Sequence, residues 1–129
     1  MAKVVWQYYT AVKENIEPNR KLFIARERSY HGATLGALDL SGHEARRALY
    51  EPMLAKNVRL IPPCYPYRDR LDNETNAEYI LRLRKALVDK IKELGHENVA
   101  GFIVEPVVGA VSGCHFISLA LRDYSSFLN

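Results

Sequence analysis

The sequence predicts an α/β fold in which helices are layered on a largely parallel sheet. Three short apolar segments, at 22–25, 58–61 and 99–104, are typical of buried strands. Segments with helical character alternate with these strands, and such crossovers are what parallel strands require. We therefore expect ligands to bind at the carboxyl ends of the strands.

The first expected element is an amphipathic helix, because apolar residues recur at helical spacing from Val4 to Val12. Pro18 and Asn19 end it. The run at 22–25, flanked by charged residues, is the first strand. After a loop at 29–32, the small and aliphatic residues at 33–38 predict a close-packed helix.

The rest of the chain continues this alternation. In order, it has a polar segment without a period at 41–53, a strand at 58–61, a loop at 62–73, a helix at 75–94 and a strand at 99–104. The helix at 75–94 has the clearest pattern, with one apolar and one charged face. Gly95 ends that helix, and Glu105-Pro106 ends the last strand.

Composition excludes several classes of protein. The chain has 129 residues, 48% hydrophobic and 26% charged, as expected for one globular domain. Its 18 basic and 15 acidic residues are interspersed, which gives no support for nucleic-acid binding. No apolar run approaches the ~20 residues of a membrane span, and the N-terminus does not resemble a secretory signal. We expect an intracellular, cytoplasmic protein without a membrane partner.

Cysteine and histidine usage points neither to a disulfide framework nor to a metal. Cys64 and Cys114 lie far apart and outside any CxxC pattern, so we expect two reduced thiols. The spacing of Cys64 with His31, His43 and His115 is not that of metal ligands. The sequence also lacks GxSxG, GxGxxG and P-loop motifs.

Two segments at strand ends are candidates for a binding site. Tyr30-His31-Gly32 offers an aromatic ring, an imidazole and a flexible glycine, which a flat charged ligand could use. The same three residues also suit a simple packing or turn feature. Glu105 follows an apolar run, so a buried carboxylate there would need an arginine, a cofactor or backbone amides as its partner. Alternatively, Glu105 is a loop carboxylate in solvent.

Three separated segments, at 23–38, 63–68 and 102–110, resemble the class III pyridoxal-phosphate-dependent aminotransferases, the omega-aminotransferase group. The resemblance extends from Lys3 to Cys114. It implies a partial three-layer α/β/α large domain of a fold-type I pyridoxal-phosphate-dependent transferase at 1–114. The residues at 115–129 depart from the family pattern and form a divergent C-terminal tail.

The resemblance also implies roles and ligands. Tyr30 would stack on the ring of pyridoxal 5'-phosphate, with His31 and Gly32 completing the turn beneath it. Glu105 would lie near the cofactor, pair with an arginine that binds the substrate carboxylate, and so gate amino donor against keto acceptor. The complete enzyme would move an amino group from an amine or amino acid to a keto acid.

In this family the Schiff-base lysine and the pyridine-binding aspartate lie downstream of the segment that matches 105–109. The phosphate-binding motif lies upstream of the first helix. None of the seven lysines lies in the matching context, so no catalytic residue is assigned and we expect no activity from this chain alone. Two alternative hypotheses are that the chain is a non-catalytic interaction partner of a full-length aminotransferase, or a truncated gene product without an independent role. For its partners, we expect a homo-oligomer or pairing with a full-length homologue.

Overall fold

The computed structural model describes residues 19–110 and the backbone of residues 115–116. In chain order the elements are β1 (Leu22–Arg26), α2 (Leu35–Leu40), α3 (Glu44–Arg47), the 3₁₀ helix η1 (Glu51–Met53), β2 (Val58–Ile61), α4 (Pro66–Asp69), α5 (Asn76–Leu94), the 3₁₀ helix η2 (His96–Asn98), β3 (Val99–Phe102), β4 (Val107–Val108) and β5 (His115–Phe116). The helix expected at 4–12 and most of the tail at 115–129 lie outside the described residues.

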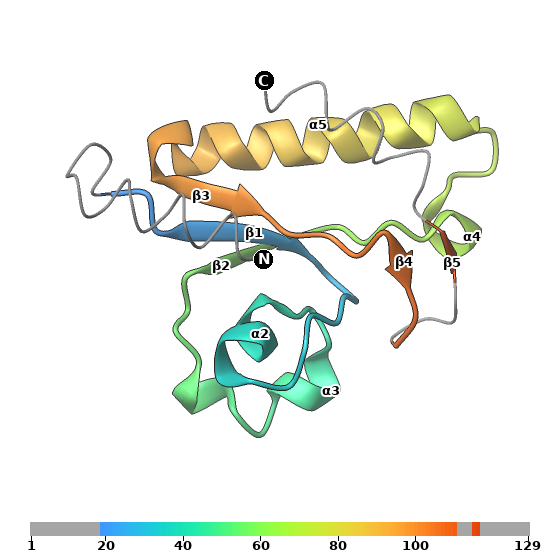
Figure 1. The fold of residues 1–129 in the computed structure, drawn as a ribbon. Helices are drawn as coiled ribbons and strands as arrows, with labels where there is room; N and C mark the ends of the chain where they lie inside the picture. The colour runs from blue at the N-terminus through green and yellow to red at the C-terminus, as the bar shows by residue number, and fades with distance from the viewer. Residues whose placement is uncertain (1–18, 111–114, 117–129) are drawn as a thin grey trace.

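The three predicted strands form one parallel sheet in the order β2-β1-β3. In β1, Ile24 and Ala25 are both 0% exposed, so the central strand is covered on both faces. In Figure 1, α5 runs along one face of the sheet, and α2 and α3 lie on the opposite side. The predicted α/β fold with a mostly parallel sheet is therefore confirmed.

The long helix α5 carries most of the core. Its buried residues Tyr79, Leu83 and Leu87 recur every four positions and pack with Ile24 and Ile61 of the sheet. This spacing places the three side chains on one helix face. Thr75 and Glu78 form a reciprocal capping box at the start of α5, which agrees with the predicted beginning of the helix.

Four short helical elements were not predicted, namely α3, η1, α4 and η2. α3 and η1 lie in the polar segment at 41–53, and α4 lies in the expected loop at 62–73. Each has at most four residues, which is too short to show a helical period. These elements are held by hydrogen bonds to their own flanking backbone, so hydrophobic spacing could not indicate them.

Three predicted boundaries moved by two residues, one of them the end of α2, which lies at Leu40 rather than Leu38. α2 begins at Leu35 rather than Ala33, because the Thr34 side chain accepts from the Ala37 N–H and caps the helix. β3 ends at Phe102 rather than Val104, although the Ile103 N–H still donates to the Ile24 carbonyl.

A small antiparallel ribbon follows the main sheet. β4 pairs with β5 in the register Val107 to Phe116 and Val108 to His115. The first two residues of the segment expected as a divergent tail therefore pair with the domain. The predicted boundary after Cys114 stays a prediction. Among the described helices, none has the length and apolar character needed to cross a membrane.

Candidate functional site

The loops after β1 and β3 meet, and this contact brings the predicted site residues together. β1 and β3 are parallel neighbours, so their carboxyl ends lie at the same edge of the sheet. The backbone N–H of Tyr30 donates to Oε2 of Glu105 at 2.8 Å, across 75 residues of sequence. Of the partners expected for Glu105, the structure provides a backbone amide.

Two buried serines shape the loop that carries Tyr30. The Ser29 hydroxyl donates to the Arg26 carbonyl at 2.6 Å and accepts from the Gly42 N–H at 3.2 Å. The His31 N–H donates to Oγ of Ser41 at 2.8 Å. Tyr30 and His31 are therefore held by hydrogen bonds from two separate segments, one before α3 and one after β3.

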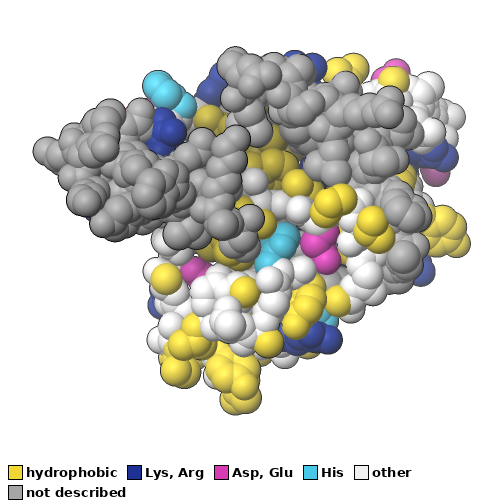
Figure 2. Space-filling view, viewed as in Figure 1, with side chains coloured by type: hydrophobic (Ala, Val, Ile, Leu, Met, Phe, Trp, Pro, Cys, Tyr) yellow, Lys and Arg dark blue, Asp and Glu magenta, His cyan; other side chains and the backbone are white. Residues whose placement is uncertain are grey.

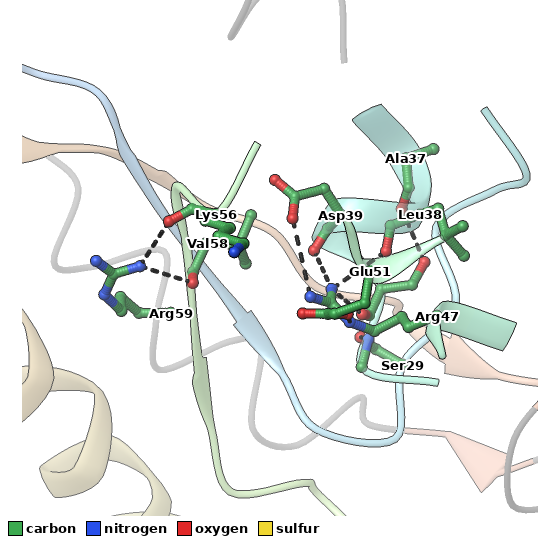
Figure 3. A network of polar contacts seen from close by, with 11 residues as sticks. Ser29, Ala37, Leu38, Asp39, Arg47, Glu51, Lys56, Val58 and Arg59 are labelled. Atoms are coloured by element: carbon green, nitrogen blue, oxygen red, sulfur yellow. Dashed lines mark hydrogen bonds and ion pairs between the residues drawn. The ribbon is translucent and has the colours of Figure 1, made fainter. Parts of the chain in front are cut away.

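Arg47 holds the end of α2 in place, as Figure 3 shows. Its Nη1 donates to the carbonyl oxygens of Leu38 at 3.3 Å, Asp39 at 2.5 Å and Ser41 at 2.9 Å. These carbonyls lie at the C-terminus of the helix, where a cation is favourable. Arg47 also pairs with Glu51 at 3.5 Å. Ser41 is thereby positioned to bind the His31 N–H.

Sequence reasoning missed Ser29, Ser41 and Arg47. The last two lie in the polar segment at 41–53, which shows no period. A usable signal was present in the Ser41-Gly42 pair, since serine and glycine are typical of a chain reversal. The carbonyl-binding role of Arg47 had no signal in the sequence, because it depends on a fold that returns α3 to the end of α2.

Gly42 allows two backbone segments to touch. A Cβ added at Gly42 would lie 2.7 Å from Cα of Glu27 and 2.8 Å from the nitrogen of Arg28. Gly32 lies within the site loop at φ 132°, a backbone conformation that favours glycine. The expectation that Gly32 provides backbone freedom at this turn agrees with that value.

The half-buried ring of Tyr30 is already in contact with a cation. The guanidinium carbon of Arg46, on α3, lies 4.5 Å from the centroid of the ring. This distance is within the range of a cation–π contact, which is worth ~0.5–1 kcal/mol at an exposed position. Arg46 therefore covers part of one face of the Tyr30 ring.

His31 has a pKa that favours the neutral ring and a buried ring nitrogen without a partner among the described residues. Burial lowers the pKa of His31, and the nearby charge of Glu105 partly opposes that shift. Its Nε2 is buried and has no hydrogen-bond partner in the described part of the chain. A neutral imidazole can either donate or accept there. The Tyr30 face and the His31 nitrogen fit a flat aromatic ligand with polar substituents.

Two further buried titratable groups, Tyr79 and Cys64, lie in the core away from this site. Tyr79 accepts from the Tyr65 N–H at 2.8 Å, and burial raises the pKa of Tyr79 to about 12. Burial also raises the pKa of the Cys64 thiol, which favours its protonated form. Within the residues described, no cluster of His, Cys, Asp or Glu is arranged to hold a metal ion.

Comparison with known proteins identifies the family. A family model described as aminotransferase class-III matches residues 2–121 of this chain. The chain belongs to the class III aminotransferases. An aminotransferase of Gibberella zeae is 44% identical over 112 residues, and a probable mitochondrial gamma-aminobutyrate transaminase of Oryza sativa subsp. indica is 40% identical over 108. The resemblance and the partial coverage expected from sequence are both confirmed.

Solved structures of the family share the fold of this class III chain. A transaminase solved with L-alanine aligns with a TM-score of 0.83 at 25% identity, over 98% of this chain and 28% of that one. An omega-aminotransferase from Paracoccus denitrificans aligns with a TM-score of 0.72 at 25% identity, over 95% and 28%. The two curated relatives cover 86% and 84% of this chain, which spans only 22% and 20% of their lengths.

Proposed function

We propose that this chain forms part of the pyridoxal-phosphate site of an enzyme that moves an amino group from an amine or amino acid to a keto acid. The observation that carries the proposal is the hydrogen bond between Tyr30 and Glu105. It joins two strand-end loops in a chain of the class III family, and it does so at the edge of the sheet where α/β folds bind ligands.

In this proposal each residue has a distinct task. Tyr30 stacks on the pyridine ring and sets its plane, worth ~0.5–1.5 kcal/mol beyond burial. His31 offers its unpartnered Nε2 to a polar substituent, and Gly32 gives the turn its backbone conformation. When bound, pyridoxal phosphate supplies the electron sink for the reaction. The protein's part is to orient that ring and exclude alternative poses.

Glu105 has two tasks in the proposal. Its Oε2 accepts a hydrogen bond from the Tyr30 backbone N–H, so the position of the Tyr30 ring depends on that of the Glu105 carboxylate. Oε1 remains for the arginine that would bind a substrate carboxylate. Such a pair can gate between donor and acceptor, because the carboxylate and the substrate compete for one cation.

The test measures binding of pyridoxamine 5'-phosphate, which lacks an aldehyde and so cannot react with lysines. We expect the wild-type chain to bind this compound saturably, as measured by a titration that monitors the fluorescence of the compound. Tyr30→Ala should weaken binding about 2- to 10-fold through lost stacking. Tyr67→Ala is the matched control, because Tyr67 is an exposed tyrosine elsewhere. Absence of saturable binding to the wild type would overturn the proposal.

The same binding assay tests the hydrogen bond between the Tyr30 N–H and the Glu105 carboxylate. Glu105→Ala removes the acceptor of the Tyr30 N–H and should weaken binding as Tyr30→Ala does, whereas Glu105→Gln keeps an acceptor oxygen and should bind more tightly than Glu105→Ala. The wild-type sample, given pyridoxal phosphate, an amino donor and a keto acid, should show no amino transfer. Turnover by the isolated chain would contradict that expectation.

A second candidate function is pairing with a further copy of the chain or with a full-length relative. Large apolar side chains are exposed on the lobe formed by α2, α3 and η1, including Leu49 at 80% and Met53 at 63%. Figure 2 shows hydrophobic side chains at the lower edge of this face, where Figure 1 places α2 and α3. Exposed apolar patches are typical of interaction surfaces.

A further inference from the structure

The loop that carries Tyr30 is joined to the segment after α2 by hydrogen bonds that involve backbone N–H groups. These bonds run from the His31 N–H to Oγ of Ser41 at 2.8 Å, from the Gly42 N–H to Oγ of Ser29 at 3.2 Å, and from the Arg28 N–H to the Gly42 carbonyl at 3.2 Å. Of these three bonds, only the one to Ser41 holds the backbone of a candidate site residue. Ser41 is therefore the residue of this segment that acts most directly on the site.

The hydroxyl group of Ser41 has a fixed orientation. It donates its proton to the Ala37 carbonyl, one helical turn earlier, at 2.8 Å. A serine hydroxyl has one proton and two acceptor lone pairs, so this donation leaves the lone pairs for the His31 N–H. Ser41 is 0% exposed, so solvent does not compete for either bond. Oγ of Ser41 is thus a preformed acceptor for the backbone directly after Tyr30.

Arg47 fixes the main chain of Ser41. Its Nη1 donates to the Ser41 carbonyl at 2.9 Å, and its Nη2 lies 3.8 Å from a carboxylate oxygen of Asp39. Asp39 is 3% exposed, so removal of Arg47 would leave a buried charge without its cation. A change at Arg47 would therefore affect folding as well as the site. The hydroxyl of Ser41 can be removed without disturbing this ion pair.

We infer that Ser41 is a positioning residue of the ring-ligand site and acts through the backbone of His31. The inference rests on the proposed function, in which Tyr30 stacks on the ligand ring. Glu105 binds the N–H of Tyr30, and Ser41 binds the N–H of the next residue. These two N–H groups flank the Cα of Tyr30, and each belongs to a planar peptide unit. Holding both units fixes the direction in which the Tyr30 side chain leaves the backbone.

This arrangement acts before the ligand binds. A loop that is already held in its binding conformation loses less conformational freedom when the ligand arrives, and the affinity is correspondingly higher. Loss of the Ser41 hydroxyl should therefore weaken ligand binding although Ser41 itself does not touch the ligand.

The experiment measures the affinity of the wild-type chain and its variants for pyridoxamine 5'-phosphate by fluorescence titration. Ser41→Ala should weaken binding about 2- to 10-fold, as expected for the loss of one hydrogen bond. Ser41→Thr keeps a hydroxyl group and should bind more tightly than Ser41→Ala. Thr75→Ala is the matched control, because it removes a hydroxyl that caps α5 and lowers stability by a comparable amount away from the site. Its affinity should equal that of the wild type.

The pKa of His31 gives a local readout that general destabilisation does not change. Burial lowers this pKa, and the charge of Glu105 partly opposes the shift. In ligand-free Ser41→Ala the loop is released, so the pKa of His31 measured by NMR should rise toward 6.5. In Thr75→Ala this pKa should keep its wild-type value. The NMR measurement decides the matter even where the extra methyl group of Ser41→Thr does not fit its buried position.

The two readouts make the inference falsifiable apart from the proposed function. If Ser41→Ala keeps either the wild-type affinity or the wild-type pKa of His31, the inference is overturned and the proposed function stands. An equal loss of affinity in Thr75→Ala would also overturn the inference, since lower stability would then explain the effect. If the wild type does not bind the compound, the proposed function fails and the inference fails with it.

Discussion

Glu105 and His31 show how single side chains depend on distant parts of the chain. The Glu105 carboxylate holds the backbone of Tyr30, and its charge also acts on the neighbouring imidazole. Burial is the larger influence on His31, so the folded protein disfavours the protonated ring. The site is therefore arranged around a neutral histidine next to a tethered tyrosine.

The pKa of His31 predicts a loss of stability in mild acid. In the folded state this pKa lies below the ordinary value of 6.5. As the pH falls through 6.5, the unfolded chain takes up a proton that the folded chain does not, so the free energy of unfolding decreases. His31→Gln should show a smaller decrease in the urea midpoint between pH 8 and pH 5. His96→Gln, which changes an exposed histidine, should retain the wild-type slope. Equal slopes in wild type and His31→Gln would contradict the assignment.

The helix α2 and the turn that ends it organise the site at the level of secondary structure. α2 has six residues, too few to be stable without tertiary support. Arg47 binds the carbonyls at its end, and Gly42 lets the following segment lie against the chain at Glu27 and Arg28. Ser41, between these two features, then accepts from the His31 N–H. The short helix α2 thus sets the position of Ser41, the hydrogen-bond acceptor of the His31 N–H.

Two glycines in this region should respond in opposite directions to alanine. Gly42→Ala would force a Cβ into the backbone of Glu27 and Arg28, so we expect a loss of roughly 2 kcal/mol or more in the free energy of unfolding. Gly36→Ala is the control within α2, because nothing lies within 4 Å of its added Cβ. Helix propensity predicts a gain of up to about 1 kcal/mol there. Urea unfolding measures both, and stabilisation by Gly42→Ala would refute the close-approach argument.

Prediction from sequence succeeded where a pattern was long or local. The helix at 75–94 was found because its apolar residues recur at helical spacing along its length and Gly95 follows as a stop. The strands were found because their apolar runs end at charge or proline. α3 and α4 were missed because four residues cannot show a period. In the site, Tyr30 and Glu105 were found as strand-end residues, whereas Arg46 and Arg47 were not distinguished from an ordinary charged surface.

The described molecule has an asymmetric distribution of apolar surface. One face of the sheet is packed against α5, and the core there includes Ile24, Ile61 and Leu83. On the α2–α3 lobe, exposed apolar side chains remain, among them Leu35, Leu49 and Met53. A patch of this kind carries a hydrophobic driving force for association.

Association through this lobe predicts a concentration-dependent sedimentation coefficient. The double variant Leu49→Glu with Met53→Glu should shift the chain toward monomer, because two buried charges would oppose the contact. Leu71→Glu is a control outside the lobe, at a leucine that is 64% exposed and so comparable with Met53. Sedimentation velocity over a range of concentrations measures the effect. A wild-type chain that stays monomeric throughout would rule out self-association, and co-purification with a full-length class III aminotransferase would then test the other partner.

Local chemistry is sufficient to locate the strands, the long helix and the strand-end residues, since apolar runs, proline breaks and capping residues act over a few positions. The same information does not say which loops meet. Sheet order β2-β1-β3 places β1 in the centre, and that order depends on packing between segments far apart in sequence. Three features of the site follow from this packing: the Tyr30–Glu105 hydrogen bond, the lowered pKa of His31 and the contact of Arg46 with the Tyr30 ring. Each arises from burial and proximity in space, which a linear pattern does not contain.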